Sequence, residues 1–407
     1  MSANGKGSLA GIKVLDLTQF EAGPSCTEAL AWLGADVAKV ENPKGGDQGR
    51  LASSEDGVTD AYYFLIFNAN KKSITADLKS EEGLAIVKKL AAEADVMIEN
   101  FAPGVIERLG LGYDEVKKVN PSIIYAQVKG FAEDGPYSDF LSFDMIGQAA
   151  GGIMSITGEP DGRPLKPGAT LGDTGTGMLM AISILGALYQ KRETGEGQRI
   201  TLAMQDAMLQ YARLAISDTM KTGKPSARAG EGVVTGGNAP MGLFPCKPGG
   251  SNDYVYIYVN RANNRQWHRL LEVIGRADLI GDERFETARD RFAHKEEINA
   301  MLEPWTMERT KAEAMETIGG GGVPCGAIYD TLELSENQDF EDRGIFQWID
   351  HPTRGKVKMP AWPVRMSGND VKVEPAPLLG EHNEVILSDW LGMSEEEIAA
   401  LKAEGTV

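Results

Sequence analysis

The sequence predicts an α/β fold, in which a large domain with a mostly parallel sheet is accompanied by a smaller α+β domain. Short apolar runs alternate with helix-periodic segments through the first half of the chain, as in a parallel sheet covered by helices. The sequence changes character near Lys221, where Gly, Pro, Lys and Ala become frequent and periodicity weakens. A chain of 407 residues also exceeds the size of one ordinary core, which favours two domains.

The N-terminal elements follow from apolar runs that lie between turn residues. The first run is bounded by Gly11 and by Ala22-Gly23-Pro24, which predicts a buried strand. A later helix is supported by Ser80 as its cap and by the acidic pair Glu81-Glu82 in its first turn. The expected elements are strands at 12–18, 35–41, 95–99 and 122–128, and helices at 25–33, 80–94 and 105–109.

The second half of the chain begins with a helix at 178–189 that is apolar nearly all round and is therefore expected to be buried. The stretch 221–248 is interpreted as linker and loop, and the alternating segment 253–260 as a half-exposed strand. The other expected elements are strands at 199–204 and 323–329, helices at 205–220, 264–275 and 295–318, and, beyond 340, short strands followed by two helices.

The composition excludes several classes of partner and site. A net charge of −18 argues against nucleic acid or an anionic membrane surface as a general partner. The first nine residues are polar, so they predict no signal peptide, and no apolar run approaches the ~20 residues of a membrane span. Cys26, Cys246 and Cys325 are far apart and form no C-x-x-C pair, which indicates neither a disulfide framework nor a zinc site. We therefore expect a cytoplasmic protein with no metal.

The stretch Leu171–Gly177 is the most informative for chemistry, because it places Asp173 in a glycine-rich turn before the apolar helix. Glycine allows close backbone approach, and the free N–H groups of a helix start can bind negative charge. Two interpretations stay open on the residues alone, namely that Asp173 is a nucleophile or that it is a plain N-cap. All four histidines lie beyond residue 260, so covalent chemistry in the N-terminal region falls to a carboxylate. An Asp with an ordinary pKa of ~4 is ionised at neutral pH and needs no general base.

The loops after the predicted strands offer candidate binding groups. Asn100 and Phe101 follow the strand 95–99, and Arg108 comes in the next helix, so they offer hydrogen bonds, an apolar face and a charge for a phosphate. The alternative is an ordinary loop with a surface arginine. Further phosphate candidates are Lys44 and the pair Lys71-Lys72.

A nicotinamide cofactor is disfavoured by the first turn. The residues Glu21–Pro24 lack the G-x-G-x-x-G pattern of dinucleotide-binding folds. Glu41 does end the second strand, where such folds carry a ribose-binding acid, but one acid without the glycines is a weak signal.

Nine segments spread over nearly the whole chain resemble the class III CoA-transferase family, which includes formyl-CoA transferase, the carnitine CoA-transferases and the 2-methylacyl-CoA racemases. Each segment is weak alone, but their joint occurrence in the family's order is specific. The segments are VLDLTQFEAGP (14–24), GADVAKVE (34–41), NANKKSITADLK (68–79), ADVMIENFAPGVIERLG (94–110), LGDTGTG (171–177), TGEGQRI (194–200), GGNAP (236–240), VPCG (323–326) and APLLGEH (376–382).

The resemblance implies that Asp173 is a catalytic carboxylate. It would attack the thioester carbonyl of an acyl-CoA donor, giving an aspartyl–acyl anhydride and a free CoA thiolate. The thiolate would then form an aspartyl–CoA thioester, from which a carboxylic acid acceptor takes the CoA. Coenzyme A would be a substrate, with no metal, nicotinamide or flavin.

The resemblance also implies an architecture and a set of contacts. The family fold is an interlocked homodimer, in which each chain has a Rossmann-like large domain built from both termini, here 1–220 with 331–407. The linker and small domain would span 221–330. A glycine-rich loop beginning at Gly236, Gly237 and Asn238 would cover the site. The residues expected to contact CoA are Phe20, Glu21, Lys44, Asn100, Phe101, Arg108 and Phe143.

Departures from the family narrow the expected reaction. Racemase members carry a His where this chain has Phe143, which cannot transfer a proton. Formyl-CoA transferases carry Gln in place of Glu21 and a glycine run in place of 240–242, which argues against oxalate chemistry. Where the family has a CoA-contacting Arg, this chain has Asn42, and Lys44 would substitute. We expect CoA transfer to a carboxylic acid such as succinate, with intramolecular CoA transfer, acyl-CoA isomerisation or racemisation, and non-catalytic CoA binding as alternatives.

Overall fold

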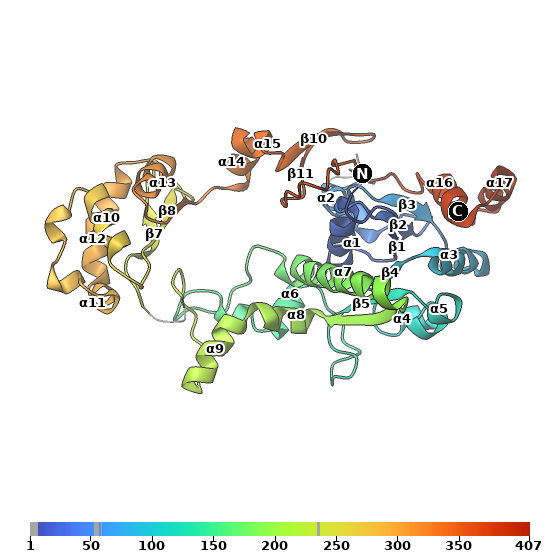
Figure 1. Ribbon diagram of the computed structural model, residues 1–407, viewed down its shortest axis with the longest axis horizontal. Helices are drawn as coiled ribbons and strands as arrows, with labels where there is room; N and C mark the ends of the chain where they lie inside the picture. The colour runs from blue at the N-terminus through green and yellow to red at the C-terminus, as the bar shows by residue number, and fades with distance from the viewer. Residues whose placement is uncertain (1–6, 53–56, 58, 234–236) are drawn as a thin grey trace. The chain divides into compact units, whose positions relative to one another are not determined.

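The computed structural model describes residues 7–52, 57, 59–233 and 237–407. The chain divides into two compact units (Figure 1). The first unit contains Met1–Ile153, Lys166–Tyr211 and Asp339–Val407. The second unit contains Met154–Leu165 and Ala212–Gln338.

The first unit is built on a six-stranded sheet whose paired strands all run parallel, in the order β3-β2-β1-β4-β5-β6. The order reverses direction between β1 and β4, and ligands of open α/β sheets bind beyond the carboxyl ends of the strands at such a switch point. The strands are β1 (Lys13–Asp16), β2 (Asp36–Glu41), β3 (Lys72–Thr75), β4 (Val96–Glu99), β5 (Ile124–Lys129) and β6 (Gln198–Ala203).

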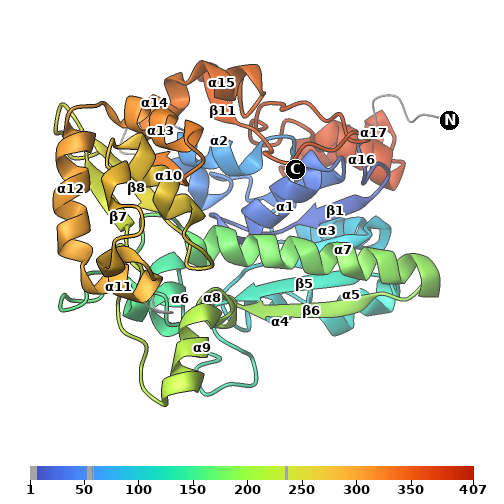
Figure 2. The ribbon, with the colours of Figure 1, turned by 60° about the vertical axis from the view of Figure 1, so that its left-hand side comes forward.

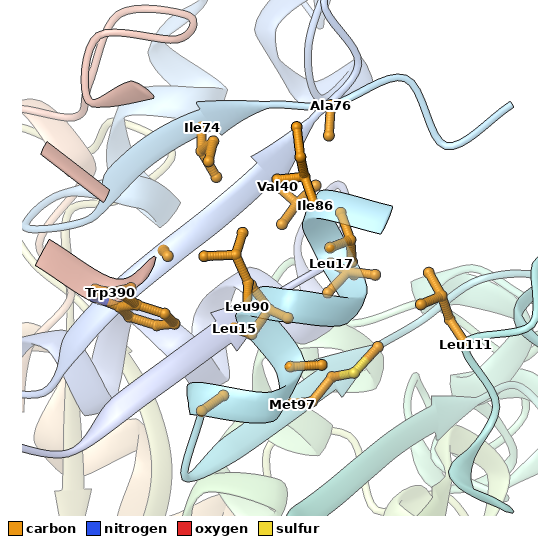
Figure 3. Close-up of a cluster of buried hydrophobic side chains, with 14 of the residues drawn as sticks. Leu15, Leu17, Val40, Ile74, Ala76, Ile86, Leu90, Met97, Leu111 and Trp390 are labelled. Carbon is orange, nitrogen blue, oxygen red and sulfur yellow. The ribbon is translucent and has the colours of Figure 1, made fainter. Parts of the chain in front are cut away.

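Helices cover both faces of this sheet because neighbouring strand residues point in opposite directions. Val14 belongs to the core that includes residues of α1 and α7, whereas Leu15 belongs to the core that includes residues of α3 and α16. Figure 3 shows the second core, with Leu15 and Leu90 close to Trp390. The helices of this unit are α1 (Ala22–Trp32), α2 (Tyr62–Asn68), α3 (Glu81–Glu93), α4 (Val105–Arg108), α5 (Tyr113–Val119), α6 (Asp144–Ala150), α7 (Thr176–Thr194), α8 (Met204–Tyr211), α16 (Asn383–Leu391) and α17 (Glu395–Ala403), with α15 (Gln338–Asp342) at the unit boundary.

The C-terminal segment closes the edge of the sheet at β3. The backbone N–H of Thr75 donates to Asn383 Oδ1 at 2.8 Å, and that of His382 donates to the carbonyl oxygen of Ser73 at 3.0 Å. The hairpin of β10 (Phe346–His351) and β11 (Gly355–Pro360) belongs to the same unit. Covering an edge strand in this way satisfies its backbone groups and removes a site of aggregation.

The helix α7 runs along β5 and β6 (Figure 2). The candidate Asp173 lies in the short turn that precedes this helix. Within the described residues, the stretch 171–194 is long and apolar enough to cross a membrane by length and composition alone. Met180 and Ile184 of this helix are fully buried in the core shared with α1 and the sheet. The helix therefore serves as a core element of the first unit.

The second unit holds a three-stranded antiparallel sheet in the order β7-β8-β9. Its core includes the buried side chains of Trp267, Phe285 and Leu302. The elements of this unit are β7 (Met241–Pro245), β8 (Tyr254–Tyr258), β9 (Cys325–Ala327), α9 (Arg213–Thr222), α10 (Arg265–Val273), α11 (Ala288–Ala293), α12 (Lys295–Met307), α13 (Lys311–Gly320) and α14 (Thr331–Glu336).

The α/β class and the parallel sheet are confirmed, and several element predictions are wrong. The stretch 221–248, predicted as linker and loop, contains β7, whose Gly242 and two flanking prolines hide the strand pattern. The helix predicted at 295–318 is two helices, because Thr310 and Glu313 form a capping box that starts α13. The helix predicted at 205–220 is likewise two, α8 and α9, without a helix-breaking residue between them.

Candidate active site

A pocket of about 340 Å³ lies at the carboxyl ends of β1 and β4, at the switch point of the first unit's sheet. Its wall combines polar groups with aromatic and aliphatic side chains, the composition expected of a ligand site. The lining residues are Gln19, Phe20, Glu21, Ala22, Gln48, Asn100, Phe101, Ala102, Pro103, Val105, Val128, Lys129, Gly130, Phe140, Leu141, Ser142, Phe143, Asp173 and Met204.

The loops after β1 and β4 are tied together across the switch point. The backbone N–H of Gln19 donates to Asn100 Oδ1 at 2.8 Å, and Asn100 Nδ2 donates to the carbonyl oxygen of Gln19 at 2.8 Å. The next residue, Phe20, has a φ of 63°, which is uncommon for a bulky residue. Its N–H donates to Asp47 Oδ1 at 3.1 Å, so the strained conformation is held from the neighbouring loop.

Buried ion pairs stabilise the loops that hold Phe20 in the pocket wall. Asp47 pairs with Lys39 at 2.7 Å, with both side chains almost fully buried. Glu41 accepts two hydrogen bonds from Arg50, each at 2.7 Å, and a third from Ser73 Oγ. The carboxylate of Glu41 is therefore buried and occupied by these donors, in agreement with the sequence argument against a dinucleotide site.

The glycines around Asp173 allow three close contacts. Two of these glycines lie in the single π-helical turn Leu171–Gly175, and the third lies in the first turn of α7. A Cβ on Gly172 would lie 2.4 Å from the carbonyl oxygen of Asp144, and one on Gly175 would lie 2.9 Å from the Tyr211 ring. A Cβ on Gly177 would lie 2.5 Å from the carbonyl oxygen of Ala22. The glycines thus let the turn pack closely against α6 and α8, and let the start of α7 pack closely against the start of α1.

The carboxylate of Asp173 is presented without a partner of its own. It caps no helix, and in the part of the chain that the structure describes it accepts no hydrogen bond. The N–H of Gly172 donates instead to Asp144 Oδ1 at 2.8 Å, which anchors the turn. The N-cap interpretation of Asp173 is therefore wrong.

The pKa of Asp173 is raised from its ordinary 3.8 to about 7. Burial is the largest cause, the carboxylates of Glu21 and Asp144 add to it, and the ammonium of Lys166 opposes them. The expectation of an ordinary, fully ionised aspartate at neutral pH is thus corrected, since this carboxyl group titrates near neutrality. Perturbed carboxyl groups of this kind cluster at functional sites.

Glu21 is the charged group that links Asp173 to the rest of the pocket. Its side chain is buried, and Oε1 accepts a hydrogen bond from Thr174 Oγ1 at 2.7 Å. The hydroxyl of Tyr63, on α2, also hydrogen-bonds to Glu21, and burial together with the charges of Glu21 and Asp173 raises the pKa of Tyr63. A buried carboxylate next to that of Asp173 makes this end of the pocket electronegative.

An Asp173→Asn variant is expected to unfold at a higher temperature than wild type at pH 8. A carboxyl group whose pKa is raised in the folded state destabilises folding wherever it is ionised. That penalty is absent below about pH 4, grows between pH 4 and 7, and is constant above. Thermal unfolding of both proteins at pH 4.5 and 8 tests this, and an advantage that does not grow with pH would contradict the raised pKa.

The structure brings together most, but not all, of the predicted site residues. Phe20, Glu21, Asn100, Phe101, Phe143 and Asp173 all line the pocket. Phe143 is exposed and its ring lies edge-on to Phe20, with centroids 6.0 Å apart. Lys44 and Arg108 are exposed side chains outside the lining set, and the guanidinium of Arg108 lies over Gly104.

The two lysines of the Lys71-Lys72 pair have different surroundings. Lys71 is buried, contacts Asp16 at 3.3 Å and donates to Asn68 Oδ1 at 2.8 Å, so its interpretation as phosphate-binding is wrong. Lys72 pairs with Asp36 at 2.9 Å but is partly exposed, and its role stays a prediction.

The predicted loop residues Gly237 and Asn238 belong to the second unit. A Cβ on Gly237 would lie 2.3 Å from the Phe292 ring, and Asn238 Nδ2 donates to the carbonyl oxygen of Val259. Gly236 lies outside the described residues. The role of these three residues as a covering loop stays a prediction.

Sequence reasoning missed Gln19, Gln48, Tyr63 and Lys129. Gln19 and Lys129 are adjacent to predicted strand ends, so their positions alone could have marked them. Gln48 and Tyr63 come from loop and helix segments with no such signal, and only the fold brings them to the site.

The sequence of this chain matches that of CoA-transferase family III over residues 9–383. The chain belongs to CoA-transferase family III. The resemblance of its motifs is therefore confirmed, and the protein is a family III CoA-transferase, an enzyme whose substrates include coenzyme A thioesters.

Curated relatives and solved structures agree with this membership. The chain is 41% identical over 412 residues to the formyl-CoA:oxalate CoA-transferase of Streptomyces coelicolor, covering 98% of this chain and 99% of the relative. It is 38% identical to the enzyme of the same name from Rhodopseudomonas palustris HaA2, covering 98% and 97%. Its fold is similar to that of a CaiB/BaiF family protein from Brucella suis, with a TM-score of 0.82, 35% identity and coverage of 95% and 100%. A hypothetical protein from Mycobacterium tuberculosis gives a TM-score of 0.78 at 29% identity, with coverage of 94% and 100%.

Proposed function

We propose that this family III enzyme transfers CoA from an acyl-CoA donor to a carboxylic acid acceptor through covalent intermediates on Asp173. One observation carries the proposal. The Asp173 carboxylate accepts no hydrogen bond from the described residues and lines a pocket at the switch point of the sheet. A carboxylate presented in this way is suited to nucleophilic attack on a thioester.

The proposed reaction balances without any other reagent. A carboxylate oxygen of Asp173 attacks the thioester carbonyl, the carbon–sulfur bond breaks, and the electron pair leaves with the CoA thiolate. The thiolate attacks the aspartyl carbonyl of the resulting anhydride and expels the donor acid, which leaves an aspartyl–CoA thioester. The acceptor carboxylate repeats these two steps in reverse, so that CoA departs on the acceptor and Asp173 is regenerated.

The surroundings of Asp173 support each role in this scheme. Burial raises the pKa of Asp173 and removes water of solvation from its carboxylate, which strengthens it as a nucleophile. Phe20, Phe101 and Phe143 line the pocket beside Asp173 and give it an apolar wall, which reduces the access of water that would hydrolyse an anhydride. Lys44 and Arg108, exposed outside the pocket, are proposed as contacts for the phosphates of CoA.

The acceptor is proposed to be a small carboxylic acid, and two pairs of substrates compete. Relatives at 38–41% identity are named for formyl-CoA and oxalate. The buried carboxylate of Glu21 disfavours oxalate, because the second carboxylate of so short a dianion would lie close to it. Succinate holds its second carboxylate farther away, so we propose succinate or an acid of similar length.

Chromatography of CoA esters tests the assignment directly. The enzyme is incubated with formyl-CoA or succinyl-CoA, each with oxalate, with succinate and with no acceptor. Transfer that requires an acceptor supports the proposal. A new CoA ester formed without an acceptor would indicate an intramolecular reaction or isomerisation instead. No exchange with any donor, together with binding of free CoA, would favour a non-catalytic CoA-binding protein.

The pH profile should report the titration of Asp173. Since the carboxylate must be ionised to attack, kcat/KM for the donor is expected to fall below about pH 7. Three charged groups change the pKa of Asp173, namely Glu21, Asp144 and Lys166. Glu21 has the largest effect of the three, and Glu21→Gln removes its charge. The acidic limb of the kcat/KM profile is then expected to move to lower pH by roughly half a pH unit or more.

Steady-state kinetics from pH 5 to 9 measure this shift. Glu82→Gln, an exposed carboxylate on α3, is the matched control and should leave the acidic limb in place. An acidic limb that stays in place with Glu21→Gln would show that Glu21 does not control the titration of the nucleophile.

A further inference from the structure

A buried ion pair lies at the carboxyl ends of β4 and β5, beside the pocket but not among the reacting groups. Lys129 Nζ lies 2.7 Å from Glu99 Oε1 and donates to Oε2 at 3.0 Å. The Glu99 side chain is fully buried, and that of Lys129 is 6% exposed. Lys129 also lines the pocket that contains Asp173.

The two members of this pair hold both backbone polar groups of one residue. The N–H of Phe101 donates to Glu99 Oε2 at 2.8 Å, and Lys129 Nζ donates to the Phe101 carbonyl oxygen at 2.9 Å. The preceding residue, Asn100, is the one whose side chain is bonded to the backbone of Gln19. The loop after β4 is thus fixed at consecutive residues, by Asn100 on one side and by the ion pair on the other.

A chain of polar side chains holds the ion pair in turn. Gln127 Nε2 donates to Glu99 Oε1 at 2.7 Å, and Arg199 Nε donates to Gln127 Oε1 at 2.6 Å. These side chains link β6 near its start, through the interior of β5, to Glu99 at the end of β4. Burial raises the pKa of Glu99, while Lys129, Gln127 and the backbone N–H of Phe101 counteract this rise.

Burying two charges costs free energy that apolar residues of the same size would not cost, so such a pair is weak evidence for stability. This pair instead fixes the backbone of Phe101. The Glu99 carboxylate accepts from its N–H, and the Lys129 ammonium donates to its carbonyl oxygen.

We propose that Glu99 and Lys129 are positioning residues, which hold the loop Asn100–Phe101 in the shape that binds the CoA thioester. The inference rests on the proposed function, because it assigns the thioester to this pocket. Loss of the ion pair frees the Phe101 backbone, so it weakens binding of CoA and leaves the attack by Asp173 intact.

The test compares Lys129→Met, Lys129→Arg and the double variant Glu99→Gln/Lys129→Met with wild type. Methionine keeps the length of the stem but donates no hydrogen bond. We expect KM for the acyl-CoA donor and Kd for free CoA, measured by titration calorimetry, to rise about tenfold, with kcat changed less than threefold. Arginine, which can still donate to the carboxylate and to a carbonyl, should restore most of the affinity.

Two further variants keep the test decisive. The double variant leaves no unpaired buried charge, so it answers the question if Lys129→Met does not fold. Lys191→Met removes the ion pair with Asp95 near the opposite end of β4 and should leave KM unchanged. A merely structural role for Lys129 would lower thermal stability and the amount of active enzyme without changing KM.

The outcomes separate this inference from the proposed function. If wild type forms no covalent adduct with an acyl-CoA, the proposed function fails. If wild type forms the adduct while the Lys129 variants keep the wild-type KM and Kd, or lose kcat alone, the positioning role is overturned and the proposed function stands.

Discussion

Asp173→Ala is expected to lower the rate of CoA transfer by at least about 10³-fold while binding of free CoA is retained. The structure gives the reason, because the Asp173 carboxylate is the nucleophile of the proposed reaction and makes no hydrogen bond that holds the pocket together within the described residues. Removal of this carboxylate therefore abolishes the nucleophile and leaves the residues that line the pocket in place. Transfer rates by chromatography of CoA esters and Kd by calorimetry measure the two effects separately.

Asp173→Asn serves as the control for shape, since it keeps the volume of the side chain without a nucleophilic oxygen. It should be as inactive as the alanine variant and bind CoA as well. Transfer within tenfold of wild type in either variant would show that another group is the nucleophile.

Gly177→Ala is expected to destabilise the protein by about 2 kcal/mol and to lower kcat/KM by about 100-fold. The new Cβ would lie 2.5 Å from the carbonyl oxygen of Ala22 and 3.0 Å from Cβ of Ser25, and backbone cannot give way as a flexible side chain does. The start of α7 must then move away from α1. That movement separates Asp173 from Glu21 and shifts the nucleophile relative to the pocket.

Gly186→Ala, two and a half turns further along the same helix, is the matched control. Gly186 is exposed, and no described atom beyond its chain neighbours and its own helix backbone lies within 4 Å of its added Cβ. Replacing a helical glycine by alanine there should stabilise the protein by about 0.5–1 kcal/mol and leave kcat/KM unchanged. Thermal unfolding and steady-state kinetics of both variants provide the test. Wild-type kinetics in Gly177→Ala would mean that the contact between α1 and α7 does not position Asp173.

Most of the large sheet could be predicted from the sequence because its strands are short apolar runs between clear turn residues. The strands β1, β2, β4, β5 and β6 fall on the expected segments. The strand β3 was not predicted, because its four residues, KSIT, begin with a charged side chain and show no alternation. The strand β7 was hidden by Pro240, Gly242 and Pro245, which usually mark loops.

The candidate site also has features that the sequence predicts and features that only the fold reveals. Asp173, Asn100 and Phe101 were found because motifs and strand ends mark them. The contribution of Glu21 to the charge around Asp173 could not be found, because the two residues are 152 positions apart and meet only through the contact of α1 with the turn 171–175. The raised pKa of Asp173 has the same origin, since burial is a property of the fold and not of the local sequence.

The intact mass of the protein after incubation with an acyl-CoA shows whether Asp173 becomes covalently modified. Wild type and Asp173→Ala are each mixed with formyl-CoA or succinyl-CoA, and a parallel sample of each receives hydroxylamine. We expect an acyl or CoA adduct on wild type alone, and we expect hydroxylamine to remove it. An adduct of equal amount on Asp173→Ala, or transfer between substrates with no labile adduct on wild type, would contradict this expectation.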